Sequence, residues 1–203
     1  MALGGKSKQE VVSEFRCGEI LNAARRVFAT KGFTEATVDD VAAAAGIAKG
    51  TVYLYFPSKR DIYLAALKHG LLELQTRTNA AMQAAEGVRA KLQAFVRTRI
   101  EYAEVDRDFF RIYHSEFGNL TKAATSDKEF QQLYLQQAKT LDLVLQTAVN
   151  DGEIRPMRTN FAAFIIYDMV RGVMTQRMLE WSTGEMEDDI AMLNDLVWKG
   201  IVA

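Results

Sequence analysis

The stretch from Ala36 to Asp61 constrains the fold of this chain more than any other part. Thr37 can cap a short helix, because its hydroxyl can accept the backbone N–H of Asp40, and the alanines that follow favour helix. Gly46 can adopt the left-handed conformation that ends a helix. A second short helix is expected over 48–56, where a proline stops it. The stretch therefore predicts two short helices joined by a tight turn.

The second short helix has an outward face that suits a nucleic acid. Val52 and Phe56, four residues apart, lie on its inner face. The outward positions are Lys49, Thr51, Tyr53 and Leu54, with Tyr55 beside them. A helix-turn-helix places such a helix in the DNA major groove. The alternative is an ordinary helical hairpin whose tyrosines pack against a neighbouring helix.

Residues 18–64 carry three patterns in a fixed order. The first helix, expected over 8–31, ends in aromatic-x-x-x-Gly-aromatic at Phe28, Gly32 and Phe33. A Thr-x-x-x-Val-Ala pattern follows at Thr37, Val41 and Ala42. The third pattern comprises Ala45, Gly46, Ile47, Gly50, Val52, Tyr53, Tyr55, Phe56 and Lys59. In these patterns the chain resembles the TetR family of bacterial transcriptional regulators, whereas the remainder is similar only in length and helical character.

The resemblance implies DNA-binding roles for particular residues. The positions matching phosphate contacts are Thr37, Tyr53, Tyr55 and Lys59. The positions matching groove contacts are Ala48, Lys49, Gly50, Thr51 and Leu54. Position 48 is often Ser in the family, and Ala48 has no hydroxyl with which to cap the helix or bond to DNA. It can instead touch a thymine methyl, so the base preference there stays open.

Composition agrees with an all-α protein in two parts. Only two prolines occur in 203 residues, and long stretches lack turn residues. We expect a helix-turn-helix DNA-binding domain at 1–57, with 1–8 as a flexible tail, and a larger helical effector-binding and dimerisation domain at 58–203. Residues 1–60 hold nine Lys and Arg against six Asp and Glu, whereas 61–203 hold sixteen against twenty. A basic N-terminal part ahead of an acidic remainder is typical of a protein that binds DNA through its N-terminal domain.

Beyond residue 57 the apolar spacing predicts further helices. We expect them from Ser58 past Leu72, over 88–105, from Asp106 to about Phe117, over 126–150, over 160–182 and over 185–202. Gly118 and Asn119 are expected to end the third of these helices, and the fourth is expected to be continuous.

The last two helices predict a homodimer. Apolar residues cover more than one face of each, at Phe161, Ile165, Met169, Gly172, Val173, Leu193, Val197 and Ile201. Gly172 costs about 1 kcal/mol in mid-helix unless close packing uses it. In the TetR family the corresponding pair of helices forms a four-helix bundle across a two-fold axis. The alternative is that both helices only complete the core of one subunit.

The body between Ala65 and Trp181 is the expected effector site. Its candidate lining residues are Phe95, Tyr102, Phe109, Tyr113, His114, Phe117, Tyr134, Phe164, Tyr167 and Asp168. The alternative is that most of these aromatic residues belong to the core, because their helical spacing is also typical of core residues. Their apolar bias indicates a small hydrophobic or aromatic effector.

The sequence offers no sign of catalysis, a metal or a cofactor. Cys17 is the only cysteine, so no intramolecular disulfide or cysteine-rich metal site can form. The two histidines, His69 and His114, lack metal-ligand spacing, and no phosphate-binding glycine loop occurs. There is no apolar run of about 20 residues and no signal-peptide core near the N-terminus, so a cytoplasmic protein is expected.

Together these features predict a ligand-responsive transcriptional regulator. We expect a repressor that binds a palindromic DNA operator as a homodimer and is released by a small effector. The rival hypothesis is a helical protein that binds a small molecule or a partner and does not bind DNA. Exposed Tyr53 and Tyr55 on a basic helix favour the first hypothesis.

Overall fold

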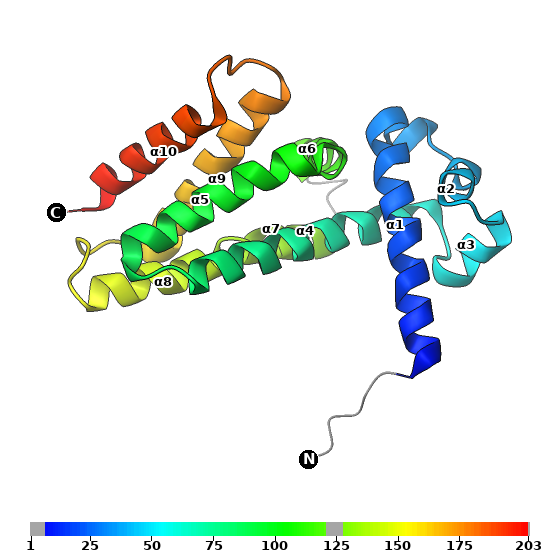
Figure 1. The fold of residues 1–203 in the computed structure, drawn as a ribbon, viewed down its shortest axis with the longest axis horizontal. Helices are drawn as coiled ribbons and strands as arrows, with labels where there is room; N and C mark the ends of the chain where they lie inside the picture. Colours follow the sequence, from blue (N-terminus) through cyan, green and yellow to red (C-terminus); the bar gives the residue numbers. More distant parts are fainter. Residues whose placement is uncertain (1–6, 121–127, 203) are drawn as a thin grey trace. The chain divides into compact units, whose positions relative to one another are not determined.

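The computed structural model describes residues 7–120 and 128–202, and the elements in these residues are all α-helices (Figure 1). In chain order they are α1 (Lys8–Glu35), α2 (Val38–Ala45), α3 (Lys49–Tyr55), α4 (Lys59–Gln83), α5 (Gly87–Val105), α6 (Arg107–Leu120), α7 (Lys128–Gln136), α8 (Lys139–Asn150), α9 (Thr159–Met178) and α10 (Met186–Ile201). The predicted all-α class, with a helix-turn-helix ahead of a larger helical part, is confirmed. None of these helices is both long enough and apolar enough to cross a membrane.

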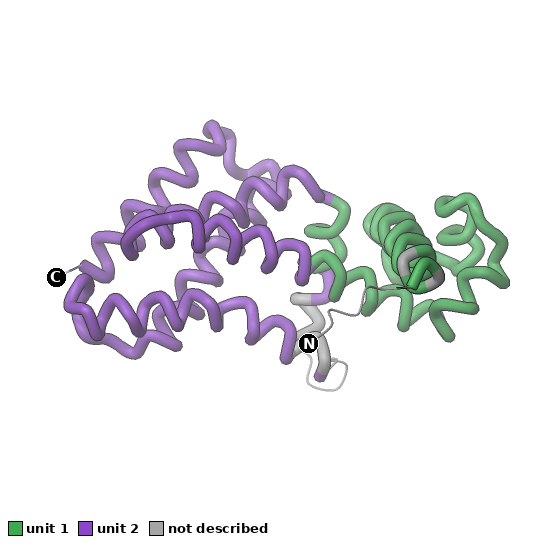
Figure 2. Tube along the Cα trace, turned by 60° about the horizontal axis from the view of Figure 1, so that its bottom comes forward, with its two compact units in different colours: residues 1–70, 108–113 green, residues 71–107, 114–203 purple. Residues whose placement is uncertain are grey.

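The chain divides into two compact units, coloured separately in Figure 2. The first contains the residues up to Gly70 together with Asp108–Tyr113, and the second contains Leu71–Arg107 and the residues from His114 onward. Helices α4 and α6 therefore contribute to both units. The first unit is larger than the 57 residues expected for a DNA-binding domain, because it keeps the first turns of α4 and a short part of α6.

Helices α1, α2 and α3 begin and end where local chemistry dictates. Gly32 interrupts α1 near its end with φ +73°, a conformation that favours glycine. Thr37 caps α2 by accepting the N–H of Asp40 at 3.1 Å, as predicted. Gly46 ends α2 in the left-handed conformation at φ +69°. The buried apolar core of this part of the first unit contains Ile20, Phe28, Val41, Val52 and Ile62.

A close contact joins α4 to the part of α6 that belongs to the first unit. A Cβ atom added to Gly70 would lie within 2.8 Å of three ring atoms of Phe109. The Phe109 ring is fully buried, and the Arg25 guanidinium lies 5.8 Å from its centroid. Arg25 is itself buried and is hydrogen-bonded to Nδ1 of His69. Glycine is therefore required at position 70 because an aromatic ring occupies the space of a side chain.

The second unit is a helical bundle in which α5 packs against α8, α9 and α10, and α9 packs against α8 and α10. Its core contains Phe95, Leu141, Leu145, Ala163 and Val170. An ion-pair network fixes one end, because Arg177 contacts Glu104 at 3.0 Å and Asp189 at 2.7 Å. These pairs join α9 to the end of α5 and the start of α10.

Three predicted helix boundaries were wrong. The expected continuous helix over 126–150 is divided into α7 and α8, because the chain turns at Gln137 and Ala138. Gln137 is buried at this turn, and its side-chain oxygen accepts a hydrogen bond from buried Arg99 at 3.1 Å. Helix α6 continues past Gly118 and Asn119 to Leu120, and α9 ends at Met178 rather than near 182. Ser126, the expected start of the long helix, lies outside the described residues.

Candidate nucleic-acid interface

Helix α3 presents a face that has no role inside the protein. Val52 is its only buried residue, whereas Tyr53 is 46% and Leu54 is 83% exposed. The hydroxyls of Tyr53 and Tyr55 make no hydrogen bond to any described residue, so both can bond to phosphate oxygens. Ala48 occupies the N-cap of α3 without a side-chain hydrogen bond, as its missing hydroxyl predicted. Gly50 is exposed, and a Cβ there would meet nothing within 4 Å.

The acidic first turn of α2 holds two lysines, Lys49 of α3 and Lys31 of α1. Lys49 contacts Asp39 at 2.7 Å, and Lys31 contacts Asp40 at 2.7 Å. The hydrogen bond to Asp39 raises the pKa of Lys49. The hydrogen bonds from Lys31 and Thr37 lower the pKa of Asp40 to about 2. Lys49 is therefore fully charged near neutral pH, but its ammonium must leave a carboxylate before it can meet a phosphate or a base.

Lys59 lies at the C-terminal end of α1. Its ammonium donates to the carbonyl oxygens of Phe33 at 2.7 Å, Thr34 at 3.1 Å and Ala36 at 2.9 Å, and lies 4.6 Å from the Phe33 ring centroid. An ammonium has three N–H donors, so these carbonyls satisfy all of them. Lys59 therefore caps α1, whose last carbonyls carry partial negative charge.

Thr37 also serves as a cap. Its hydroxyl donates to Asp40 at 2.9 Å while accepting the backbone N–H of the same residue. Of the four side chains expected at phosphates, only Tyr53 and Tyr55 have polar atoms that make no bond within the described chain.

The second unit brings together four of the ten residues expected around an effector. Tyr134 lies 5.7 Å from the Phe164 ring and 5.3 Å from the Tyr167 ring, edge to face. Its hydroxyl donates to Asp168 at 2.6 Å, and Asp168 is paired with Arg171 at 3.1 Å. Burial and the carboxylate of Asp168 raise the pKa of Tyr134. This cluster combines aromatic rings with a hydrogen-bonded carboxylate, and Tyr134 and Tyr167 are buried in it.

Phe109, Tyr113 and Tyr102, which were also expected around an effector, make contacts outside this cluster. Phe109 and Tyr113 belong to the first unit, where Phe109 packs against Gly70. Tyr102 is buried and contacts Arg77, whose guanidinium lies 5.1 Å from its ring. Burial and the charge of Arg171 lower the pKa of His114. The side chain of Phe117 is outside the described residues.

Sequence reasoning missed a buried cation beside the cluster. The guanidinium of Arg99 lies 5.2 Å from the Phe95 ring and 4.9 Å from the Tyr167 ring, and it donates to Gln137. Arg99 is only 2% exposed. Its position in the apolar stripe of α5, four residues after Phe95 and one before Ile100, is the signal that could have revealed it.

Two models of one family match the chain. The first, described as bacterial regulatory proteins of the tetR family, matches residues 20–66, and the second, the tetracyclin repressor-like C-terminal domain, matches residues 85–175. The HTH-type transcriptional repressor KstR2 of Rhodococcus jostii is 30% identical over 143 residues, which cover 68% of this chain and 67% of that protein. The chain belongs to the TetR family. It is a DNA-binding transcriptional regulator, as the sequence predicted.

Further likenesses extend the comparison. The HTH-type transcriptional activator FasR of Mycolicibacterium smegmatis is 29% identical over 109 residues, which cover 54% of this chain and 50% of that protein. The fatty acid degradation regulator FadR of Bacillus halodurans has the same fold, with a TM-score of 0.75 at 22% identity over 89% of this chain and 96% of that one. The relatives thus include a protein named as an activator and one named as a repressor.

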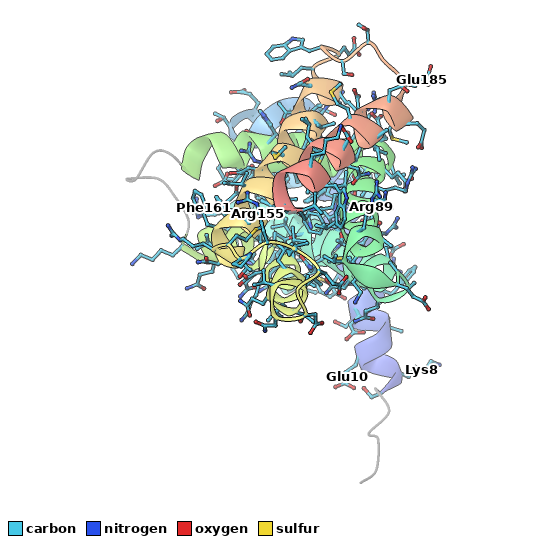
Figure 3. All side chains as sticks on the ribbon, turned by 90° about the vertical axis from the view of Figure 1, so that its left-hand side faces the viewer. Lys8, Glu10, Arg89, Arg155, Phe161 and Glu185 are labelled. Carbon is cyan, nitrogen blue, oxygen red and sulfur yellow. The ribbon has the colours of Figure 1, made fainter. Side chains whose placement is uncertain are left out.

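The surface that the TetR family resemblance assigns to a dimer differs in detail from the expected one. On α9, Phe161 and Ile165 are exposed and line a groove of about 490 Å³ between α9 and α10. Figure 3 shows Phe161 beside Arg155, whose guanidinium donates to the carbonyl of Gly200 at 2.7 Å. Met169, Gly172 and Val173 are half-buried.

On α10 the expected interface residues lie on the inner face. Leu193, Val197 and Ile201 are buried in the subunit's own core, so they have almost no surface to offer a partner. The apolar residues that α10 leaves exposed are Met192 and Leu196.

Proposed function

We propose that this TetR-family chain is a repressor that binds a palindromic operator as a homodimer and is released by a small hydrophobic effector. The exposed face of α3 carries the proposal, because an exposed Leu54 and two tyrosine hydroxyls without bonds need a partner outside the chain. The apolar side chain suits thymine methyls in a major groove, and the hydroxyls suit phosphates.

A homodimer supplies two such faces to one operator. Phe161, Ile165, Met192 and Leu196 form an exposed apolar surface on two neighbouring helices. A second copy of the same surface, related by a two-fold axis, buries both. A two-fold dimer places its recognition helices on half-sites of a palindrome.

The cluster around Tyr134 is the proposed effector region. Aromatic rings of Phe164 and Tyr167 supply apolar surface, and Asp168 with Arg171 supplies polar anchoring. Fatty-acid-derived compounds are the first class to screen, because the structurally similar Bacillus halodurans protein is described as a fatty acid degradation regulator. An effector releases DNA only if it binds one arrangement of the dimer better than the other.

This function requires binding and no catalysis. Its place of action is the cytoplasm, where a bacterial operator lies. The rival proposal, a helical protein that binds a small molecule or partner but not DNA, leaves the exposed face of α3 without a purpose.

Selection of bound DNA from a random pool tests the proposal directly. The wild-type protein should enrich an inverted repeat, whereas a Tyr53→Phe, Leu54→Ala double variant, changed only at exposed positions, should enrich it poorly. Enrichment of a single unrepeated site would contradict the dimer. Failure of the folded wild-type protein to enrich any sequence would support the rival proposal.

A further inference from the structure

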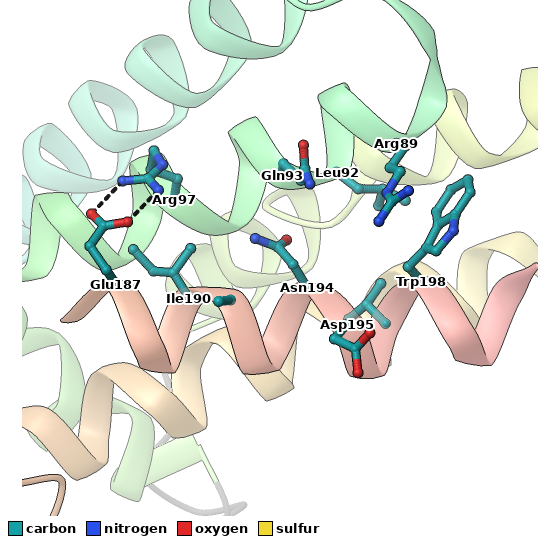
Figure 4. A pocket seen from close by; sticks show the side chains of 11 residues that line it. Arg89, Leu92, Gln93, Arg97, Glu187, Ile190, Asn194, Asp195 and Trp198 are labelled. Atoms are coloured by element: carbon teal, nitrogen blue, oxygen red, sulfur yellow. Dashed lines mark hydrogen bonds and ion pairs between the residues drawn. The ribbon is translucent and has the colours of Figure 1, made fainter. Parts of the chain in front are cut away.

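A second groove, distinct from the proposed effector region, runs between α5 and α10 (Figure 4). Its volume is about 440 Å³, within the range of small-ligand sites. Its floor is apolar, formed by Leu92, Ile190 and Val197, which are all buried. The amide side chains of Gln93 and Asn194 line it midway, between two charged ends.

The groove exists because the side of α10 that faces α5 carries a small side chain between two large ones. Positions 187 and 198 carry large side chains, Glu187 and Trp198, whereas Ala191 between them carries only a methyl group. On α5 the groove-lining residues Arg89, Gln93 and Arg97 recur every four residues, so they share one face. The space over Ala191 is therefore left open between the larger side chains of Glu187 and Trp198.

The two ends differ in their charge balance. At one end Arg97 donates to both carboxylate oxygens of Glu187, at 2.7 Å and 2.6 Å. Within the groove, Asp195 is paired with Lys199 at 2.8 Å. At the other end Arg89 forms no ion pair with any described residue, and its guanidinium lies 5.2 Å from the Trp198 ring centroid. The one charge lining the groove without a counter-charge is therefore positive.

The geometry points to a small-molecule site for a planar aromatic carboxylate in this groove. Arg89 presents a flat fork of N–H donors that matches a carboxylate in two parallel hydrogen bonds. It lies in the first turn of α5, where the helix dipole also favours an anion. The aromatic part of the ligand lies over Ile190 and Leu92, and the amides of Gln93 and Asn194 meet its polar edge.

The site does not depend on the proposed function, since none of its residues belongs to the DNA-binding face or to the cluster around Tyr134. It does adjoin the proposed dimer surface, because Val197 lines both this groove and the groove between α9 and α10. A bound ligand would hold α10 against α5.

Binding is tested by titrating the ¹⁵N-labelled full chain with 2-naphthoate and following the indole N–H signals. The chain has two tryptophans, and a Trp198→Phe variant identifies which signal belongs to the groove. The Trp198 signal should shift to saturation, whereas that of Trp181, outside the groove and 74% exposed, should stay in place. The uncharged 2-naphthamide should bind at least about tenfold more weakly, because a charge-assisted bond is lost.

Variants distinguish ligand binding in the groove from a non-specific effect of surface charge. Arg89→Gln should weaken 2-naphthoate binding roughly tenfold to a hundredfold. Lys91→Gln removes the same charge from the same helix outside the groove lining and should leave affinity unchanged. Ala191→Leu, at an exposed position, should fill the open space and abolish binding. An unshifted Trp198 signal at millimolar 2-naphthoate, or equal affinity in Arg89→Gln and wild type, would overturn the assignment.

Discussion

Replacing Lys59 with alanine separates two roles for a residue at the edge of the DNA-binding face. The TetR family resemblance assigns this position to a phosphate, whereas the structure gives all three ammonium donors to carbonyls at the end of α1. If Lys59 acts as a helix cap, Lys59→Ala should destabilise the protein and leave the salt dependence of DNA affinity unchanged.

The magnitude follows from the bonds that are lost. A hydrogen bond to a charged group contributes about 1.5–3 kcal/mol, but the carbonyls regain water when this half-buried ammonium is removed, so the three do not add. We expect a loss of about 1–3 kcal/mol in the free energy of unfolding. A phosphate contact would instead contribute roughly 0.9 to the slope of log affinity against log salt, or about 2 for two subunits on one operator.

Urea unfolding and salt-dependent operator binding measure the two quantities on the same variants. Lys59→Arg is the matched control, since it keeps the charge but its planar fork cannot point three donors at converging carbonyls. The cap predicts that both variants lose stability and keep the wild-type salt slope. A slope lowered by about 2 in Lys59→Ala, with stability unchanged in both variants, would refute the cap.

Three further changes test other contacts. Asp39→Asn should release the lysine that it holds and tighten binding to random-sequence DNA roughly threefold to tenfold by fluorescence anisotropy; weaker binding would contradict this. Gly70→Ala should cost about 1–3 kcal/mol by urea unfolding in the wild type, yet should stabilise by about 1 kcal/mol in a Phe109→Ala background, where the obstructing ring is gone; the same cost in both backgrounds would be inconsistent with the clash. Leu196→Glu should yield monomers by sedimentation, whereas Leu143→Glu, equally exposed on α8, should leave the dimer intact.

The parts of the fold that the sequence predicted well depend on local chemistry. The caps at Thr37 and Gly46 follow from side-chain hydrogen bonding and backbone conformation within a few residues. The absence of a cap at Ala48 follows from its methyl side chain alone. Such features need no knowledge of the rest of the chain, so a single sequence is sufficient to place them.

The wrong predictions depend on tertiary contacts. Nothing near Gln137 breaks a helix locally, and the turn there is accompanied by a buried bond to Arg99, 38 residues earlier. The outward face of α10 could not be chosen from the sequence for a related reason. Met192, Leu193 and Leu196 give the helix apolar residues on two faces, and only packing against α5 and α9 decides which face is buried.

The DNA-binding surface shows why residue type alone leaves roles ambiguous. A helix N-terminus presents N–H groups to an anion and a C-terminus presents carbonyls to a cation, so a polar residue there suits either a cap or DNA. Thr37 and Lys59 are engaged in caps, which hold α1 and α2 in shape. Tyr53 and Leu54 have no such internal role and are exposed. Specific contacts should therefore be concentrated on α3, while the caps determine how α3 is presented.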